Sequence, residues 1–144
     1  MPKISPVLDV KQDPDTGIQD RLLSLLRQST AEAVGLPNNR DFAITLSHPR
    51  TGDLMGGLWG QSRWNIFFVD ILSVAGDLRG QGLGSQLMEM AEAEARNRQC
   101  SLMWLDTYAF QARPFYERHG FEVFAQFDGA PPIYPQYFMK KSLD

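Results

Sequence analysis

A glycine-dense turn with one arginine, Arg79-Gly80-Gln81-Gly82-Leu83-Gly84, has the residue types and the spacing to bind an anionic group. An apolar, strand-like run ends just before it at Val74, and an amphipathic run begins inside it and continues to about Arg98. Glycines let the backbone approach a ligand closely, and the first amides of a helix lack internal partners and carry the positive end of its dipole. The pattern therefore predicts a phosphate-binding turn.

Three kinds of phosphate-binding loop compete for this turn. A Walker A loop needs Gly-x-x-x-x-Gly-Lys-Ser/Thr, a string that the sequence lacks. In the dinucleotide fingerprint Gly80 and Gly82 fit, but the third glycine is replaced by Ser85. In an Arg-x-x-Gly-x-Gly turn for the pyrophosphate of coenzyme A, Arg79, Gly82 and Gly84 occupy the required positions. A plain strand-to-helix corner without a ligand remains open at this point.

Two acidic residues are candidates for proton chemistry. Asp70 stands between Val69 and Ile71 in an apolar run, where an unpaired carboxylate is costly and such a placement often marks function. An ion pair with an arginine is the alternative explanation for Asp70. Asp106, which follows the next apolar run, is a second candidate acid, and capping of the following helix is its alternative role.

The order of predicted elements is β-α-β-β-β-α-β-α-β-β. Thr16 and Gln19 have capping-box spacing for a helix that Gly35 and Pro37 end, with apolar residues from Ile18 to Ala33 at helical spacing. The helix to Arg98 buries Leu83, Leu87, Met90 and Ala91, and a short helix with Pro114 in its first turn ends at Gly120. Strands are predicted at residues 4–10, 42–47, 54–61, 64–74, 101–105, 121–127 and 133–140.

The connections between these elements predict a mixed sheet. A tight turn at Ser62-Arg63 precedes the central run, which is apolar on both faces, and the strand after the long helix is expected to pair with that run in parallel. The last two strands close the chain as a hairpin. The chain is expected to form one domain over residues 1–144.

Composition and charge narrow the class of protein. A net charge of −3 gives no basic face for nucleic acid, and no apolar stretch is long enough to span a membrane. The first residues lack the apolar core of a signal peptide, and the single cysteine, Cys100, excludes an internal disulfide and is expected to be buried. These features predict a cytoplasmic protein, and no metal site is expected.

The glycine turn, together with a second string 30 residues downstream, resembles a known family. The run Ile71-Leu72-Ser73-Val74 and the turn after it resemble motif A of the GNAT acetyltransferase superfamily, and Phe115-Tyr116-Glu117-Arg118-His119-Gly120-Phe121 resembles its Tyr-Glu-x-x-Gly-Phe segment. The element order matches that of the family along nearly the whole chain. The resemblance implies a mixed α/β GNAT fold whose central sheet splays between the fourth and fifth strands.

The family resemblance implies a role for each matching residue. Acetyl-CoA would be the co-substrate, with its pantetheine arm along the central strand; a glutamate or aspartate at the position of Asp70 would bind the amine or draw its proton through water. Tyr116 would protonate the departing thiolate, for which a pKa near 10 is suitable. Ala109 replaces an asparagine common in the family, and Gln111 is a candidate substitute. The implied cofactor-binding residues are Leu72, Ser73, Val74, Arg79, Gly80, Gln81, Gly82, Leu83, Gly84, Ser85 and Gln111.

The function that the resemblance implies is N-acetylation of a primary amine, preferably on a small molecule, by direct attack in a ternary complex. The alternatives are an inactive acyl-CoA-binding sensor or interaction module, and an acetyltransferase for protein N-termini or lysines. Aromatic residues near the presumed acceptor cleft are expected mostly in core or sheet-face packing, with some lining the acceptor pocket: Trp59, Trp64, Tyr108, Phe110, Tyr134 and Tyr137. An acidic, aromatic pocket would favour a cationic small molecule over a polyanion. Dimers are common in the family, so a homodimer is among the expected states.

Overall fold

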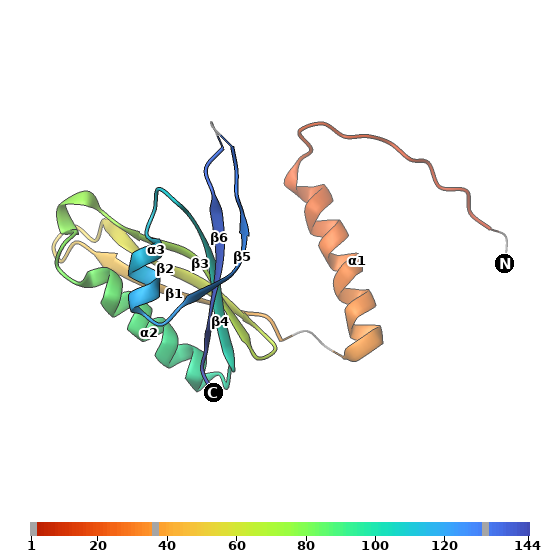
Figure 1. The fold of residues 1–144 in the computed structure, drawn as a ribbon. Helices are drawn as coiled ribbons and strands as arrows, with labels where there is room; N and C mark the ends of the chain where they lie inside the picture. Colours follow the sequence, from red (N-terminus) through yellow and green to blue (C-terminus); the bar gives the residue numbers. More distant parts are fainter. Residues whose placement is uncertain (1–2, 36–37, 131–132) are drawn as a thin grey trace. The chain divides into compact units, whose positions relative to one another are not determined.

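The computed structural model describes residues 3–35, 38–130 and 133–144 of the chain. Contacts within the chain divide it into two compact units, Met1–Pro37 and Asn38–Asp144, each of which is described by itself (Figure 1). The expectation of one domain over residues 1–144 remains a prediction.

The first unit contains one long helix, α1 (Thr16–Val34). Asp15 is its N-cap, because the Asp15 side chain accepts a hydrogen bond from the amide of Gly17 at 2.9 Å. The prediction that Thr16 caps the helix was therefore wrong by one residue. Gly35, with φ of 94°, ends the helix as predicted, and Pro37 lies outside the described residues.

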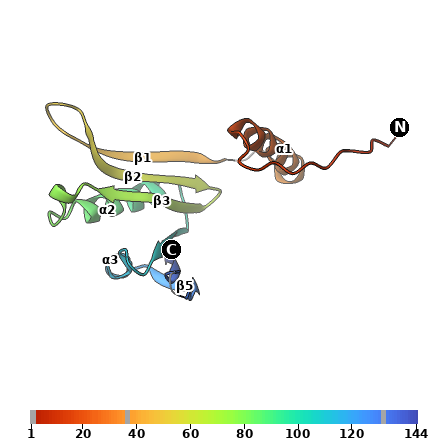
Figure 2. The ribbon, with the colours of Figure 1, turned by 90° about the horizontal axis from the view of Figure 1, so that it is seen from above.

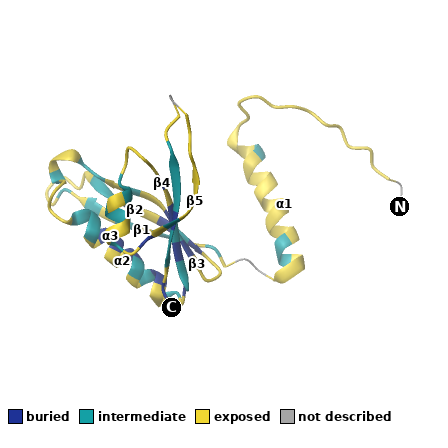
Figure 3. Ribbon diagram, in the orientation of Figure 1, coloured by how far each residue is buried: buried dark blue, intermediate teal, exposed yellow. Residues whose placement is uncertain are grey.

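One further expectation for this unit was wrong. Residues 3–11 form no strand, because no other strand in the described chain pairs with them, so the element order begins with a helix. The apolar residues of α1 recur at helical spacing but are not buried, and Leu22, Leu25 and Leu26 are each more than 60% exposed (Figure 3). The helical spacing of the apolar residues thus predicted the position of the helix, but these residues do not form a buried face in this unit.

The second unit is a six-stranded mixed sheet with helices, in strand order β1-β2-β3-β4-β6-β5. The mixed α/β class is confirmed, and β6 inserts between β4 and β5 while pairing antiparallel with both. Its elements are β1 (Arg40–Ser47), β2 (Leu54–Arg63), β3 (Ile66–Val74), the short 3-10 turn η1 (Gly76–Leu78), α2 (Leu83–Asn97), β4 (Leu102–Tyr108), α3 (Arg113–Arg118), β5 (Glu122–Phe127) and β6 (Gln136–Ser142).

The turn between β2 and β3 differs from the prediction. Ser62 and Arg63 belong to β2, and the chain turns at Trp64 and Asn65 instead. Trp64 has a positive φ of 51°, and its amide donates a hydrogen bond of 2.7 Å to the side-chain oxygen of Asn38. A contact from a distant residue therefore fixes a turn that local turn chemistry did not indicate.

The helix α2 packs along β2 and β3 on one face of the sheet (Figure 2). Leu87 and Ala91 are buried as predicted, and Met88 is buried beside them. Met90 is 52% exposed, so its predicted burial was wrong. The apolar stripe of α2 runs instead through Leu87, Met88, Ala91 and Ala95.

The parallel contact between β3 and β4 is short. Only Ile66, Phe67 and Phe68 pair with Leu102, Met103 and Trp104. Beyond Phe68, β3 keeps its antiparallel partner β2, whereas β4 continues along β6 to Tyr108. The two central strands therefore separate after three pairs, and this confirms the splayed sheet.

The guanidinium of Arg98 joins the end of α2 to the first two strands. Its side chain is only 6% exposed and pairs with Glu94 at 2.9 Å. It also donates hydrogen bonds to the carbonyls of Arg40 and Asp41 at 2.9 and 3.2 Å, and to the hydroxyl of Ser62 at 3.0 Å. Because these acceptors belong to three different elements, Arg98 fixes how α2 lies on the sheet.

Replacing Arg98 with alanine should lower the free energy of unfolding by about 3 kcal/mol, because the buried hydroxyl of Ser62, the carbonyls of β1 and Glu94 all lose their partner. Chemical denaturation measures this change. Arg50→Ala, in the exposed turn after β1, is the control and should change the free energy by less than about 0.5 kcal/mol. Equal effects of the two substitutions would show that Arg98 does not hold α2 in place.

Candidate active site

A cavity of about 450 Å³ lies where the end of β3, the glycine turn, the start of α2 and α3 meet. Nine of the eleven predicted cofactor-binding residues line it, whereas Gln81 and Gln111 do not. The complete lining is Leu72, Ser73, Val74, Leu78, Arg79, Gly80, Gly82, Leu83, Gly84, Ser85, Ala112, Phe115 and Arg118. The fold thus brings the central strand and the glycine turn, separate segments in sequence, to one space, which we call the cofactor cavity.

The three glycines of the turn are required for two different structural reasons. Gly80 and Gly82 have φ of 80° and 77°, a region that other residues rarely adopt, and a Cβ atom on either would meet open space. Gly82 is the N-cap of α2. A Cβ atom on Gly84 would lie 3.4 Å from the ring of Phe115, so this glycine lets the start of α2 approach α3.

The charges at the cofactor cavity suit an anion. The amides of Leu83, Gly84 and Ser85 precede the first hydrogen bond of α2, which Gln86 makes to the carbonyl of Gly82 at 3.1 Å. Arg79 lies at the same end of α2, and its Nε donates to the carbonyl of Val74 at 3.2 Å. Free amides and a guanidinium are hydrogen-bond donors, as a pyrophosphate requires.

Gln111 stands outside the cofactor cavity and supports the turn after β4. Its side-chain oxygen accepts hydrogen bonds from the amide of Tyr108 at 2.8 Å and from the hydroxyl of Thr107 at 3.3 Å. Only the amide nitrogen of Gln111 remains for a ligand, and its role in cofactor binding stays a prediction.

Asp70 occupies a bulge at the point where the sheet splays. In the register of β2 and β3, Gly60 pairs with Val69 and Trp59 pairs with Ile71, so Asp70 is the extra residue. Its side chain is exposed, and it forms no ion pair with any residue that the structure describes. The ion-pair alternative is therefore not supported, and Asp70 lies two residues beyond the last parallel pair.

Tyr116 belongs to α3, is packed against the hydrophobic core and does not line the cofactor cavity, whereas Asp106 belongs to β4. Burial raises the pKa of Tyr116, and the negative charge of Asp106 raises it further. Asp106 accepts a hydrogen bond of 2.7 Å from the side chain of Gln136 on β6. Its alternative role as a helix cap was wrong, because the N-cap of α3 is Ala112. Tyr116 is thus a protonated phenol whose ionisation Asp106 opposes.

Exposed aromatic side chains gather where β4 and the loop before β6 meet. The ring of Phe110 stacks on that of Tyr108 at 5.6 Å and meets that of Tyr134 edge-on at 4.9 Å. We call these three rings the aromatic cluster. All three residues are among the six aromatic residues predicted to lie near the acceptor cleft. Trp64 lies at the β2–β3 turn, and Tyr137 packs against Arg113.

Sequence reasoning missed four residues that line the cofactor cavity: Leu78, Ala112, Phe115 and Arg118. Phe115 and Arg118 flank Tyr116 inside the quoted Phe-Tyr-Glu-Arg string, yet only the tyrosine was assigned a role. Their places in that string were a usable signal, because residues one before and two after Tyr116 on a short helix can face the same neighbouring element.

The model of the family described as "Acetyltransferase (GNAT) family" matches residues 13–121. Blasticidin-S acetyltransferase of Streptomyces morookaense is 40% identical over 93 residues, which cover 64% of this chain and 68% of that relative. The crystal structure of a protein from Agrobacterium tumefaciens matches with a TM-score of 0.89 and 26% identity, over 96% of this chain and all of that one. Nourseothricin acetyltransferase matches with a TM-score of 0.58 and 28% identity, over 75% and 67% of the two chains.

Two further observations concern the described part of the chain. None of its helices is both long enough and apolar enough to cross a membrane. Within those same residues, no three His, Cys, Asp or Glu side chains come together in a way that could hold a metal ion.

Replacing Gly82 with valine should abolish measurable binding of coenzyme A, because valine disfavours a φ of 77° and its side chain would enter the cofactor cavity. Isothermal titration calorimetry measures the affinity, and circular dichroism verifies the fold. Gly76→Ala is the matched control, since Gly76 does not line the cavity and a Cβ atom there meets open space. Unchanged affinity in a folded Gly82→Val protein would remove the turn from the binding site.

Proposed function

Because the chain belongs to the acetyltransferase (GNAT) family, we propose that it transfers an acetyl group from acetyl-CoA to the primary amine of a small molecule. The observation that carries this proposal is the cofactor cavity, which joins the free end of β3 to the N-terminus of α2. When bound, acetyl-CoA supplies an acetyl group that is already activated as a thioester. The protein then has to position an amine and manage two protons.

The residues of the cofactor cavity fit coenzyme A. The amides at the start of α2, with Arg79 and Arg118, would hold the pyrophosphate. Gly80 and Gly82 leave the space in front of them open, as a group lying against the backbone requires. The end of β3 around Leu72 and Val74 has no parallel neighbour among the described strands, so this edge is suited to the pantetheine arm.

Asp70 and Tyr116 are the residues that we assign to proton transfer. Asp70, exposed in its bulge, would hold the acceptor ammonium and receive its proton directly or through water. Tyr116 would donate its phenolic proton to the departing thiolate. Because burial and Asp106 both raise the pKa of Tyr116, the phenol stays protonated at neutral pH, as a general acid must.

The acceptor side of the site is acidic and aromatic. Asp70 and Asp106 come from the two strands that separate, and the aromatic cluster lies at the end of β4. Carboxylates and aromatic faces both attract cations, so the site favours a cationic amine over an anionic acceptor. The names of two related proteins, acetyltransferases of blasticidin-S and nourseothricin, support a small-molecule acceptor.

An inactive acyl-CoA-binding module is the second candidate. Ala109, in place of the family's asparagine, is the observation in its favour, since alanine offers no side-chain polar group to a cofactor. Acetyl-CoA turnover with a panel of small amines, monitored as free thiol, separates the two functions. Peptides with free N-termini or lysines belong in the panel, because their faster acetylation would favour a protein acceptor. Binding of coenzyme A without turnover of any amine would favour the inactive module.

Tyr116→Phe should lower kcat by roughly a hundredfold or more while the affinity for coenzyme A stays within about threefold, because it removes one proton and little volume. Steady-state kinetics and calorimetry measure the two quantities. Tyr137→Phe, a half-buried tyrosine on β6, is the control and should retain full kcat. An active Tyr116→Phe enzyme would exclude Tyr116 as the acid.

Asp70→Asn should lower kcat/KM for the amine by roughly a hundredfold, because the amide neither holds the ammonium by charge nor accepts its proton. The KM for acetyl-CoA should change little, since Asp70 does not line the cofactor cavity. Asp77→Asn, in the exposed turn before the glycines, serves as the acidic control. If both variants keep the wild-type kcat/KM, the base is not Asp70.

A further inference from the structure

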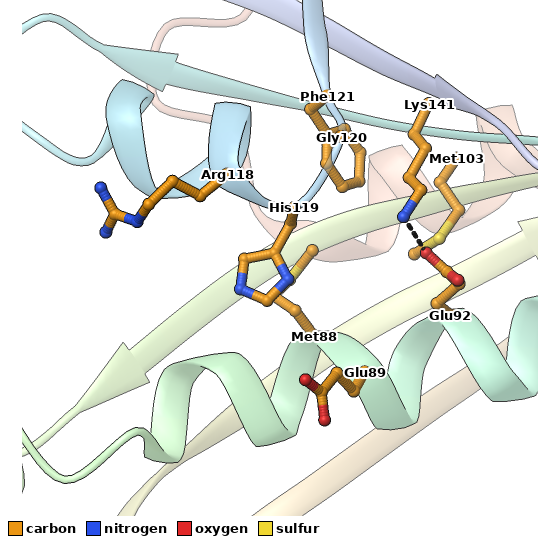
Figure 4. Close-up of a pocket in the computed structure, with 9 residues that line it drawn as sticks. All are labelled: Met88, Glu89, Glu92, Met103, Arg118, His119, Gly120, Phe121 and Lys141. Atoms are coloured by element: carbon orange, nitrogen blue, oxygen red, sulfur yellow. Dashed lines mark ion pairs between the residues drawn. The ribbon is translucent and has the colours of Figure 1, made fainter.

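A second cavity adjoins the cofactor cavity on the far side of the last turn of α3. Its volume is also about 450 Å³, and α2, α3, β4 and β6 all contribute to its lining. Met88, Met103 and Phe121 form its apolar part (Figure 4). We call it the α2–α3 cavity. Arg118 lines both cavities, so this helix end separates the two spaces.

One hydrogen bond crosses from one cavity to the other. His119 lines the α2–α3 cavity, Ser85 lines the cofactor cavity, and their Nε2 and Oγ atoms lie 3.0 Å apart. Ser85 belongs to the first turn of α2, beside the free amides that would face the pyrophosphate. The ring of Phe115, 4.8 Å from the imidazole, packs against its other side. The imidazole is thus held next to the anion-binding turn without lining the cofactor cavity itself.

The direction of this hydrogen bond decides what Ser85 offers to a ligand. A hydroxyl has a single proton and two acceptor lone pairs. If Ser85 donates to His119, only lone pairs face the cofactor cavity, and these repel a phosphate oxygen. If His119 donates to Ser85, the hydroxyl proton is available to the ligand.

We propose that His119 is a positioning residue for the cofactor: by donating from Nε2 to Ser85 Oγ, it leaves the serine hydroxyl to donate to the pyrophosphate of coenzyme A. The inference rests on the proposed function, because it takes the cofactor cavity as the pyrophosphate site. Imidazolium always carries the Nε2 proton and adds a positive charge near the ligand, whereas neutral imidazole carries that proton in only one tautomer. Protonation of the imidazole should therefore raise the affinity.

Other charged groups line the α2–α3 cavity with the imidazole, and of these the guanidinium of Arg118 points away from it (Figure 4). Glu89 and Glu92 come from α2, Arg118 from α3 and Lys141 from β6 (Figure 4). Burial alone would raise the pKa of Glu92, but hydrogen bonds and charges from Lys141 and Arg96 lower it below its usual range. Glu92 therefore stays ionised through the range in which histidine titrates. Glu89 is the exposed carboxylate of the group, and Glu89→Gln tests its influence.

The experiment is a calorimetric titration with dephospho-CoA between about pH 7.5 and pH 5.5, the range of an ordinary histidine. Dephospho-CoA keeps the pyrophosphate and lacks the 3′-phosphate, whose own second pKa of about 6 would otherwise titrate in the same range. The variants are Ser85→Ala, His119→Leu, His119→Gln and the control Glu89→Gln. The amide nitrogen of glutamine replaces the Nε2 donor but does not titrate. Circular dichroism at each pH verifies that every variant is folded.

The wild-type affinity should rise about three- to tenfold as the pH falls, which corresponds to one hydrogen bond. Ser85→Ala and His119→Leu should bind more weakly at low pH and lose the pH dependence, and the double variant should bind no more weakly than either one. His119→Gln should bind more tightly than His119→Leu at every pH and without a pH dependence, but somewhat more weakly than the wild type at low pH, because the amide keeps the donor and lacks the charge. Glu89→Gln should keep the wild-type profile.

Two results would overturn the inference while the proposed function stands. One is binding with an unchanged pH profile in Ser85→Ala or His119→Leu. The other is a His119→Gln protein that binds as weakly as His119→Leu. In that case the imidazole ring would support binding by some other property than the Nε2 hydrogen-bond donor. A folded wild-type protein that binds neither coenzyme A nor dephospho-CoA at any pH would overturn the proposed function, and the inference with it.

Discussion

The separation of β3 from β4 after three residue pairs is the constraint on which the rest of the site depends. Up to Phe68 the two strands pair in parallel. Beyond Phe68, β3 makes backbone hydrogen bonds to β2 alone and β4 makes them to β6 alone, so their facing edges have no strand partner among the described residues. Backbone groups left without a partner inside a sheet are costly unless water or a ligand binds them. The splay therefore creates an edge for a ligand in the middle of the sheet, and the Asp70 bulge lies where that edge begins.

The long helix α2 links this edge to the anion-binding turn, and its two ends are held by different means. At its C-terminal end, the buried guanidinium of Arg98 joins α2 to β1 and β2. At its N-terminal end, Gly82 caps the helix with a positive φ, and Gly84 lets it approach Phe115. A rigid C-terminal anchor thus holds the free amides at the other end in a fixed position, and the short helix α3 adds Phe115 and Arg118 to the lining of the cofactor cavity.

Much of this arrangement could be predicted from the sequence, because its signals are local. The glycine turn, the helix after it, the parallel strand and the closing hairpin all follow from residue spacing, and the family resemblance added the splay. The failures arose where distant contacts decide. Asn38 fixes the turn at Trp64, and Gln136 binds Asp106, which does not cap α3. Among the described residues, no strand pairs with residues 4–10. The Ser85–His119 contact joins residues 34 positions apart, which no local pattern reveals.

Amide chemical shifts followed by NMR during a titration with coenzyme A test the central claim most directly, because they report every backbone position at once. If the free edge of β3 and the start of α2 form the cofactor site, the largest changes should fall on Gly80–Ser85 and on Leu72–Val74. The amides of β1, whose partner among the described strands is β2, should change little. Changes confined to the α2–α3 cavity, or spread over β1 and α1 with the glycine turn unaffected, would contradict the account.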